Sequence, residues 1–330
     1  MKTTKTIVAV CRADAAPIAG FLLAGLTAAV LSLGASEAQA ASAKAPVKPA
    51  PVVAAKPAPA AVEAEVEDDG FEVEDAFGFS QGAATAGEGK WEASSTLTGA
   101  FGRSKGSYRA FQTESEAEYG ITDRIQMGFA AFTDAHRVRN VPQLDNISSF
   151  GFDGLSVSPK IAILQKDIDG PVGFAVEGEL EWRRHDEASG QSGRFYQGGL
   201  TALSDWVVMP NTLYAAANAG FELGRGRENG EAWETESSVF ASGALSWRFT
   251  KRATIGAEAR LESAFEDVFG KREGTALFLG PTFFWKISGK VSVAAAWSTQ
   301  VWGNGPDSHG RLNLDAFDRH RGMLKIGLEF

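Results

Sequence analysis

The ten residues that end the chain restrict its fold more than any other stretch. Apolar and polar side chains alternate there with a period of two, so a β-strand would carry the apolar ones on one face and the charged ones on the other. The apolar row consists of Leu324, Ile326, Leu328 and Phe330. A strand that finishes on an aromatic residue suits a barrel strand whose end lies at a membrane interface. We therefore predict the closing strand of an outer-membrane β-barrel, with this row as the assembly signal for the barrel assembly machinery.

The start of the chain has the layout of a secretory signal. Lys2 and Lys5 precede an apolar stretch over residues 18 to 33, which is followed by a small-x-small sequence ending at Ala40. We predict a signal peptide over residues 1 to 40, with cleavage after Ala40. Acylation at Cys11 is the alternative, but Cys11 precedes the apolar stretch and so lies on the wrong side of it.

Two further features narrow the class of protein. Cys11 is the only cysteine, so the mature chain would have neither a disulfide framework nor a thiolate metal site. The formal net charge of -9 argues against nucleic acid as a partner. Beyond the signal, no segment has the eighteen or so consecutive apolar residues that a membrane helix needs. If the protein spans a membrane, it must do so with strands.

Residues 41 to 75 differ in composition from the rest of the chain. Residues 41 to 62 are almost entirely Ala, Pro, Lys and Val, and residues 63 to 75 carry acidic charges without a basic one. Such sequences lack the bulky apolar groups that a folded core requires. The acidic run lacks the regular oxygen-ligand spacing of a calcium loop. We predict a disordered periplasmic arm, with peptidoglycan as a candidate partner, followed by a barrel domain over residues 76 to 330.

From Trp91 onward the sequence reads as amphipathic strands. In the stretch 172 to 185, for example, Leu180 and Trp182 share one face while Glu179, Glu181 and Arg183 share the other. The predicted strands cover residues 91–102, 108–119, 125–137, 153–164, 172–185, 194–207, 212–224, 233–249, 253–265, 274–287, 291–302 and 320–330. We therefore expect an all-β fold, a transmembrane antiparallel up-and-down β-barrel of about twelve strands.

The connections between these strands support a membrane barrel. Those after the second, fourth, sixth, eighth and tenth strands are short, whereas those after the third and the eleventh, residues 138–152 and 303–319, are the longest. Outer-membrane barrels have short periplasmic turns and longer external loops. Aromatic residues also gather near both predicted strand ends, as two interfacial girdles would require. A soluble sandwich is disfavoured, because soluble proteins seldom display this much apolar surface.

Several stretches resemble a known family. They are residues 77–82 (FGFSQG), 118–124 (EYGITDR), 151–155 (GFDGL), 256–260 (GAEAR) and 277–282 (LFLGPT). Together they resemble an uncharacterised family of proteobacterial outer-membrane β-barrel proteins and, more loosely, porin-like barrels found near aromatic-degradation pathways. The resemblance covers residues 76 to 330. It implies a barrel in the bacterial outer membrane and carries no catalytic residues.

If the apolar faces meet lipid, the opposite faces line the lumen. The predicted lining residues are Glu114, Glu116, Glu118, Lys160, Glu177, Glu179, Glu181, Arg183, Arg248, Glu258, Arg260, Glu262, Lys325 and Glu329. Acids outnumber bases, so an open lumen would favour cations. Two interpretations stay open. The barrel is a narrow diffusion channel for small solutes, or it is a structural or surface-binding barrel whose carboxylates and basic groups pair in a packed interior.

An outer-membrane hydrolase is a weaker alternative. The four histidines, His136, His185, His309 and His320, all map to outer strand ends or loops. His136 could approach Ser148 or Ser149, yet no serine-centred elbow motif is present.

A metal site at the mouth is also weakly indicated, from His309 and His320 with Asp307, Asp315 or Asp318. We predict no catalytic residue, no metal and no cofactor. The expected partners are outer-membrane lipid, the barrel assembly machinery and small solutes.

Overall fold

The described part of the chain folds as one closed antiparallel barrel. A computed structural model describes residues 76–166, 168–306, 308 and 310–330. Its strands are β1 (Trp91–Phe101), β2 (Ser107–Thr122), β3 (Ile125–Arg139), β4 (Ile147–Leu164), β5 (Val172–His185), β6 (Ser192–Met209), β7 (Leu213–Glu228), β8 (Glu234–Thr250), β9 (Ala253–Glu266), β10 (Arg272–Lys286), β11 (Val291–Asn304) and β12 (His320–Glu329). The predicted signal peptide with its cleavage site at Ala40, and the predicted arm over residues 41 to 75, lie outside the described residues.

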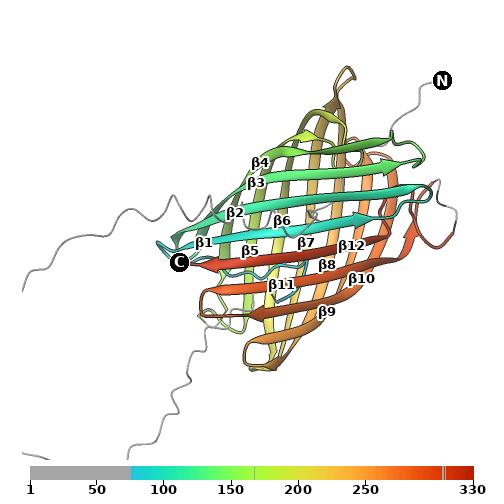
Figure 1. Cartoon of the computed structure of the whole chain (residues 1–330). Helices are drawn as coiled ribbons and strands as arrows, with labels where there is room; N and C mark the ends of the chain where they lie inside the picture. Colours follow the sequence, from blue (N-terminus) through green and yellow to red (C-terminus); the bar gives the residue numbers. More distant parts are fainter. Residues whose placement is uncertain (1–75, 167, 307, 309) are drawn as a thin grey trace, which may run out of the picture. The chain divides into compact units, whose positions relative to one another are not determined.

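Each strand pairs with its neighbours in sequence, and the first pairs with the last. The seam between β1 and β12 runs from Glu92 opposite Glu329 to Phe101 opposite His320. Figure 1 shows β12 lying directly beside β1. Closure leaves no strand edge unpaired, which is the condition for a sheet to lie in lipid. The predicted twelve-stranded up-and-down barrel is confirmed.

Strand β4 is longer than the sequence predicts. It begins at Ile147, which pairs with Val138, and the ladder is interrupted by a register shift between Phe132 and Thr133. The shift places one extra residue, Asp153, in β4. Because a bulge of this kind breaks the alternation of side chains, the periodicity of the sequence does not extend through it.

Burial on the two faces of the sheet is inverted relative to a soluble protein. Outward residues are apolar and exposed, as for Leu180, which is 64 % exposed. Inward residues are charged and buried, as for Glu262, which is 2 % exposed, and Arg321. This is the pattern of a barrel whose outer surface meets lipid and whose interior is polar. The described residues contain no helix that is long and apolar enough to cross a membrane.

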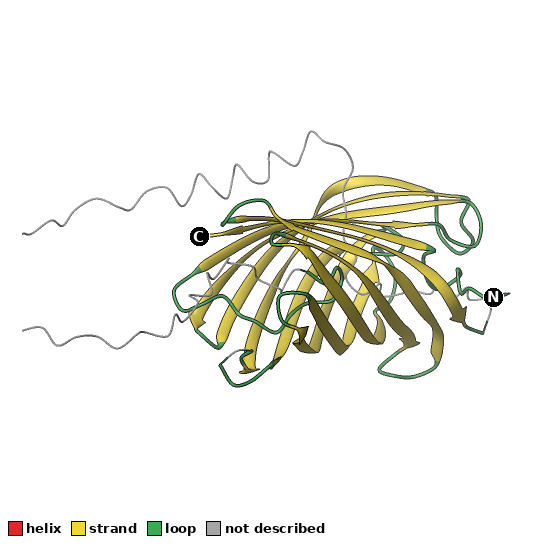
Figure 2. Cartoon of the chain, turned by 90° about the horizontal axis from the view of Figure 1, so that it is seen from below, coloured by secondary structure: helices red, strands yellow, loops and turns green. Residues whose placement is uncertain are grey.

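The two ends of the barrel differ. At the end where β12 finishes, which we call the turn end, the connections have two to four residues except that between β4 and β5, which covers residues 165–171. At the opposite end, the loop end, the connections after β3, β5 and β11 are longer, over residues 140–146, 186–191 and 305–319. Figure 2 shows connections at both ends and the strands inclined between them. In outer-membrane barrels the short turns face the periplasm.

Candidate functional site in the barrel lumen

The structure places the predicted lining residues on the inner face of the barrel. Glu114, Glu116 and Glu118 project from β2 and face Lys160 and Lys325 around one cavity. A second set lines the wall nearby or lies buried on the inward faces of β5, β8, β9 and β12: Glu177, Glu179, Glu181, Arg183, Arg248, Glu258, Arg260, Glu262 and Glu329. The inward positions therefore carry a mixture of charges in which carboxylates are more numerous.

The lumen also contains a stretch of chain that is not part of the wall. Residues 76–86, which we call the lumen segment, run inside the barrel before the chain turns into β1. Phe77 is fully buried against Tyr214 and Phe284, which point inward from β7 and β10. Gly78 has a φ of +80°, and a Cβ atom there would lie 2.5 Å from Cγ2 of Thr282. Only glycine fits this close approach to the wall.

Glu258 on β9 is the principal anchor of the lumen segment. Its Oε2 accepts a hydrogen bond from the backbone N–H of Phe79 at 2.9 Å, and its Oε1 accepts one from the hydroxyl of Ser80 at 2.7 Å. The Ser80 hydroxyl also lies 2.8 Å from that of Ser242 on β8. All of these groups are buried or half-buried, so the bonds are shielded from water and are stronger for it.

Further backbone amides of the lumen segment bond to wall side chains in sequence. The acceptors come from strands successively further around the barrel, so the segment crosses from the β8–β9 side to the β2–β3 side. The pairs are Gln81 N to Asn218 Oδ1 at 2.8 Å, Ala83 N to Asp205 Oδ1 at 3.0 Å, and Ala86 N to Gln126 Oε1 at 2.7 Å. The segment thus spans the turn half of the lumen and reduces its free cross-section.

Two cavities remain beside the lumen segment. The larger, of about 120 Å³, is lined by Glu114, Glu116 and Glu118. The smaller, of about 50 Å³, is lined by Glu179 and Glu222 among others. Phe79 and Gln81 line both, so the segment separates one acidic space from the other.

Beyond the cavities, on the loop side, the wall carries buried ion pairs that face the lumen. Arg183 on β5 bonds to Glu181 at 2.7 Å, to Asp153 at 3.1 Å and to Glu187 at 3.1 Å. Its guanidinium carbon lies 4.0 Å from the ring centroid of Phe132. Each arginine donor therefore has a partner, as a buried charge requires.

A second ion-pair group repeats this arrangement on the opposite wall. Arg321 bonds to Glu262 at 2.7 Å and to Asp318 at 2.9 Å, and Arg260 bonds to the same Glu262 at 2.5 Å. Arg321 also lies over the ring of Phe278, at 4.0 Å. The two groups together, which we call the arginine layer, line two opposite sides of the loop half of the lumen.

The longer loops fold over the arginine layer. In the loop after β11, Phe317 and Asp318 are almost fully buried, and Asn313 is held by Gln300 of β11. Arg103, between β1 and β2, donates to the carbonyl of Ala316 at 2.7 Å. The loops after β3 and β5 meet this loop around a cavity of only about 20 Å³. Both ends of the lumen are therefore narrowed by the chain itself.

The histidines of the loop end that the structure describes are engaged as structural groups. His136 Nδ1 lies 3.1 Å from Asp134, and its Nε2 lies 2.9 Å from the carbonyl oxygen of Glu187. Ser149 is the cross-strand partner of His136, but both ring nitrogens already have other partners. This geometry does not present a histidine as the base for a serine nucleophile. His320 bonds to Thr299 at 3.0 Å.

One group of side chains has donor atoms close enough together for a metal ion. The ligand atoms of Asp134, Asp153 and His185 lie within 4.8 Å of one another. Asp153 already accepts bonds from the backbone amides of Arg184 and His185 and from Arg183. The Nδ1 atom of His185 lies 3.2 Å from Asp134 and 3.3 Å from Asp153, so the three side chains form a compact charged group that joins β3, β4 and β5.

The metal site considered from the sequence is not assembled in the described part of the chain. Asp307 and His309 lie outside the described residues. Asp318 is paired with Arg321, and Asp315 is exposed.

The predicted assembly row lies on the outer surface at the seam. Leu324 and Leu328 pair with Leu97 and Ala93 of β1, on the face away from the lumen. The backbone N–H of Phe330 bonds to the carbonyl of Trp91 at 3.0 Å. Its role as an assembly signal stays a prediction: deleting Phe330 should lower the yield of folded barrel.

Comparison with known proteins gives a family and a fold. Residues 70–330 match the model of a family of unknown function, DUF6662. The chain belongs to this family. No curated protein sequence matches the chain.

Solved structures give the fold. The barrel is similar to that of an outer-membrane channel from Pseudomonas putida F1, with 11 % identity and a TM-score of 0.53, over 75 % of this chain and 98 % of that one. The NanC porin matches with 12 % identity and a TM-score of 0.41, over 73 % and 98 % of the two chains. The KdgM porin, in complex with disordered oligogalacturonate, matches with 10 % identity and a TM-score of 0.39, over 73 % and 99 %. The first of these likenesses supports an outer-membrane barrel fold, and the expected resemblance to uncharacterised porin-like barrels is confirmed.

The lumen segment is the feature that the sequence did not predict. Residues 76–90 belonged to the predicted barrel domain without an assigned structure. A signal was present in Phe77-Gly78-Phe79, where two large apolar residues flank a glycine outside any strand. Aromatic residues that precede an amphipathic strand without continuing its alternation have to be buried elsewhere.

Proposed function

We propose that the protein is an outer-membrane channel for small solutes with a narrow acidic lumen, and that the lumen segment holds this channel closed. The barrel fold, the charged inner face and the two acidic cavities support a polar pathway. The lumen segment divides that pathway. We also infer that the protein is not an enzyme, because both ring nitrogens of His136 are already occupied.

The observation that carries the proposal is how the lumen segment is held. Four of its backbone amides donate hydrogen bonds to side-chain acceptors of the wall, Glu258 and Asn218 among them, and further bonds involve its Ser80 hydroxyl and its own carbonyl oxygens. A hydrogen bond of this kind contributes a net ~1 kcal/mol, because the same groups bond to water when it breaks. The lumen segment is held by a few such bonds and by one buried ring, that of Phe77. Water can therefore compete for its hydrogen bonds and release it. The wall itself does not have to change.

Once the lumen segment moves, the exposed lining would favour cations. Glu177, Glu179 and Glu181 follow one another along β5 at the smaller cavity. Carboxylates around a narrow pore attract cations and repel anions. Replacing Glu177 and Glu179 by Gln should reduce cation selectivity in a conducting barrel without preventing folding, whereas Glu181 is left in place because it pairs with Arg183.

The arginine layer favours a second candidate, a structural or surface-binding barrel that transports nothing. Arg183 and Arg321 each bond to more than one carboxylate, and all of these groups are buried in the loop half. In a barrel with only a structural role, we would expect buried ion pairs of this kind along the whole lumen. The difference between the two functions lies in whether removal of the lumen segment opens a path.

A reversible cross-link tests the proposal directly. The hydroxyls of Ser80 and Ser242 lie 2.8 Å apart, so cysteines at both positions would be close enough to form a disulfide. Cys11 is the only native cysteine and can be replaced by Ser. We expect the Ser80→Cys/Ser242→Cys barrel to show no openings in a planar bilayer when oxidised, and openings with cation preference after reduction.

The single variant Ser80→Cys is the matched control and should respond to neither oxidant nor reductant. Deletion of residues 76–86 should give a constantly open barrel. If the reduced double variant and the deletion both stay silent although each barrel is folded, the structural alternative is correct.

A further inference from the structure

The outer surface of the loop end carries arginines in direct cross-strand register. Arg109 on β2 lies opposite Arg137 on β3, and Arg194 on β6 lies opposite Arg227 on β7. All four side chains face outward, and Arg109, Arg137 and Arg194 are exposed. Like charges that face each other across a strand pair are destabilising unless something neutralises them.

The chain supplies no such neutralisation among the residues that the structure describes. None of these four arginines forms an ion pair with a described carboxylate. The inner face of the same barrel shows the opposite behaviour, because Arg183 and Arg321 there have several carboxylate partners each. The outward pairs are therefore arranged for an anion that is not part of the chain.

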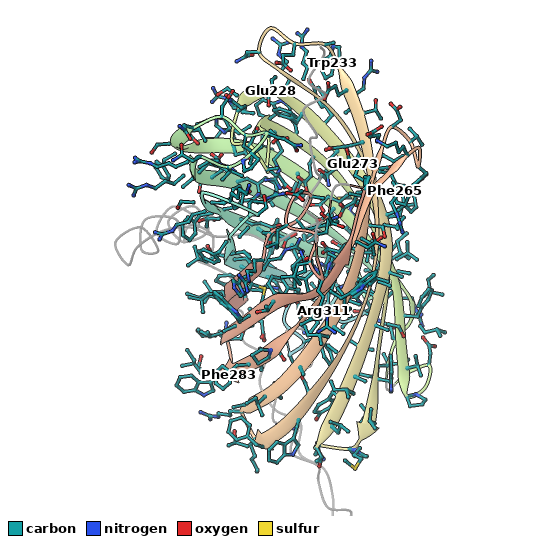
Figure 3. All side chains as sticks on the ribbon, turned by 90° about the vertical axis from the view of Figure 1, so that its right-hand side faces the viewer. Glu228, Trp233, Phe265, Glu273, Phe283 and Arg311 are labelled. Carbon is teal, nitrogen blue, oxygen red and sulfur yellow. The ribbon has the colours of Figure 1, made fainter. Side chains whose placement is uncertain are left out.

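Aromatic rings lie beside the arginine pair of β6 and β7. The guanidinium carbons of Arg225 and Arg227 lie 5.4 Å and 5.0 Å from the ring centroid of Trp233, and Trp233 stacks on Tyr196 at 6.2 Å. Figure 3 shows Trp233 at the far tip of the β7–β8 hairpin. We call Arg194, Tyr196, Arg225, Arg227 and Trp233 the arginine–tryptophan patch.

The position of the patch indicates what it meets. Towards the middle of the barrel, the same outward faces of β6 and β7 continue with Leu200, opposite Phe221. Leu200 is 49 % exposed, as a lipid-facing residue would be. Rings with one polar edge concentrate at the headgroup level of a membrane. This step rests on the proposed membrane location, which puts the loop end in the outer leaflet.

No such in-register pair of arginines occurs among the described residues of the turn end. Charges of both signs are exposed there, and Arg124 is paired with Asp169 at 2.7 Å. Lys251 and Arg252 are exposed on the β8–β9 turn and Lys290 on the β10–β11 turn, outside the strands, so none of them is opposed in register. The in-register arginine pairs are thus particular to the loop end.

We propose that the arginine–tryptophan patch binds a phosphate-bearing glycolipid of the outer leaflet. The guanidinium groups of Arg194, Arg225 and Arg227 would bond to phosphate oxygens, for which their planar forks are well suited. The rings of Tyr196 and Trp233 would lie against the sugar and the first carbons of the acyl chains. The lipid relieves the repulsion between Arg194 and Arg227.

The test uses the folded full-length barrel in a neutral detergent. Diphosphoryl lipid A is titrated in mixed micelles, and binding is read by native mass spectrometry and by the tryptophan fluorescence of the barrel. The variant Arg194→Gln/Arg225→Gln/Arg227→Gln should bind at least ten-fold more weakly than wild type. The control Lys251→Gln/Arg252→Gln/Lys290→Gln removes equal charge from the turn end and should bind like wild type.

Equal binding by the two triple variants would overturn the inference, since the attraction would then be general. A dephosphorylated lipid that binds as well as lipid A, or inorganic phosphate that competes at lipid-like concentrations, would also overturn it. Folding of each variant is checked by its mobility with and without heating. Failure of wild type to insert into vesicles would refute the membrane location instead, so the two failures are distinguishable.

Discussion

The two halves of the lumen are narrowed by different means. In the turn half, the lumen segment is a separate piece of chain whose amides bond to wall acceptors such as Glu258 and Asp205, with acidic cavities beside it. In the loop half, the arginine layer narrows the lumen; its arginines belong to the strands, and its charges are paired. A segment of chain outside the wall can move out of the lumen, whereas the arginine side chains of the wall strands stay in place. The turn half is therefore suited to gating, and the loop half to rigidity.

The largest effect should come from breaking the arginine layer. Replacing Arg321 by Met leaves Glu262 and Asp318 buried without their strongest partner. Removing one member of a buried ion pair costs roughly 3–5 kcal/mol. We expect a marked drop in the thermal unfolding temperature of the detergent-folded barrel. Arg319→Met, at an exposed neighbour, should have little effect, and equal stability of the two variants would contradict the comparison.

A slightly smaller and more local effect is expected at Phe77. Truncating a fully buried phenylalanine costs about 3 kcal/mol or more. Because Phe77 belongs to the lumen segment, Phe77→Ala should release that segment and leave the strands intact. Hydrogen exchange should become fast over residues 76–86 while the strand amides stay protected. Phe283→Ala, on the outer surface in Figure 3, is the size-matched control; a general loss of strand protection in Phe77→Ala would contradict the idea of a separable filling.

Removing the charge of Glu258 should loosen the lumen segment more gently. Glu258→Gln keeps one acceptor but weakens the bonds from Phe79 and Ser80, at a cost of ~1 kcal/mol. The open fraction in bilayer recordings should rise about five-fold. Glu114→Gln lies at the larger cavity and tests whether any lost carboxylate has the same effect. If both variants open equally, the anchor role of Glu258 is wrong.

The smallest effect concerns pH at the loop end. Burial raises the pKa of Glu187, in the loop after β5, to about 8, and nearby Arg183 opposes the rise. The pKa of this carboxyl group is therefore higher in the folded than in the unfolded protein. Its contribution to stability is fully present below the unfolded pKa and is lost as the pH rises towards the folded pKa of about 8. The loop should therefore be less protected from hydrogen exchange at pH 9 than at pH 6. Glu187→Gln should abolish that difference, whereas its persistence would assign the effect to another group.

Much of the wall was predictable, because strand periodicity is a local property. The alternation around Leu180 and Glu181 determines which side chains face lipid, and a residue that faces inward in one strand has an inward partner in the next. The bounds of β5, Val172–His185, agree with the sequence prediction for this reason. The extra residue at Asp153 was missed, since a bulge depends on the partner strand.

The filling of the lumen was not predictable by the same means. Phe77 is buried by residues from β7, β8, β10 and β11, and Phe79 bonds to a glutamate 179 positions away. No local pattern encodes such contacts. The sequence also leaves open which carboxylates are paired, because Glu181 and Glu179 look alike in sequence although only Glu181 bonds to Arg183.

The distance in sequence between the lumen segment and its anchors has a consequence for the order of folding. Every wall group that holds the segment, from Gln126 to Glu258, comes later in the chain than the segment itself. The groups closest to Gly78, on Thr282 and Ala296, are later still. The segment therefore cannot settle until nearly the whole barrel has been made and closed. Its seating is a late step of maturation, and a barrel that failed to close would be recognisable by a loose, protease-sensitive stretch before Trp91.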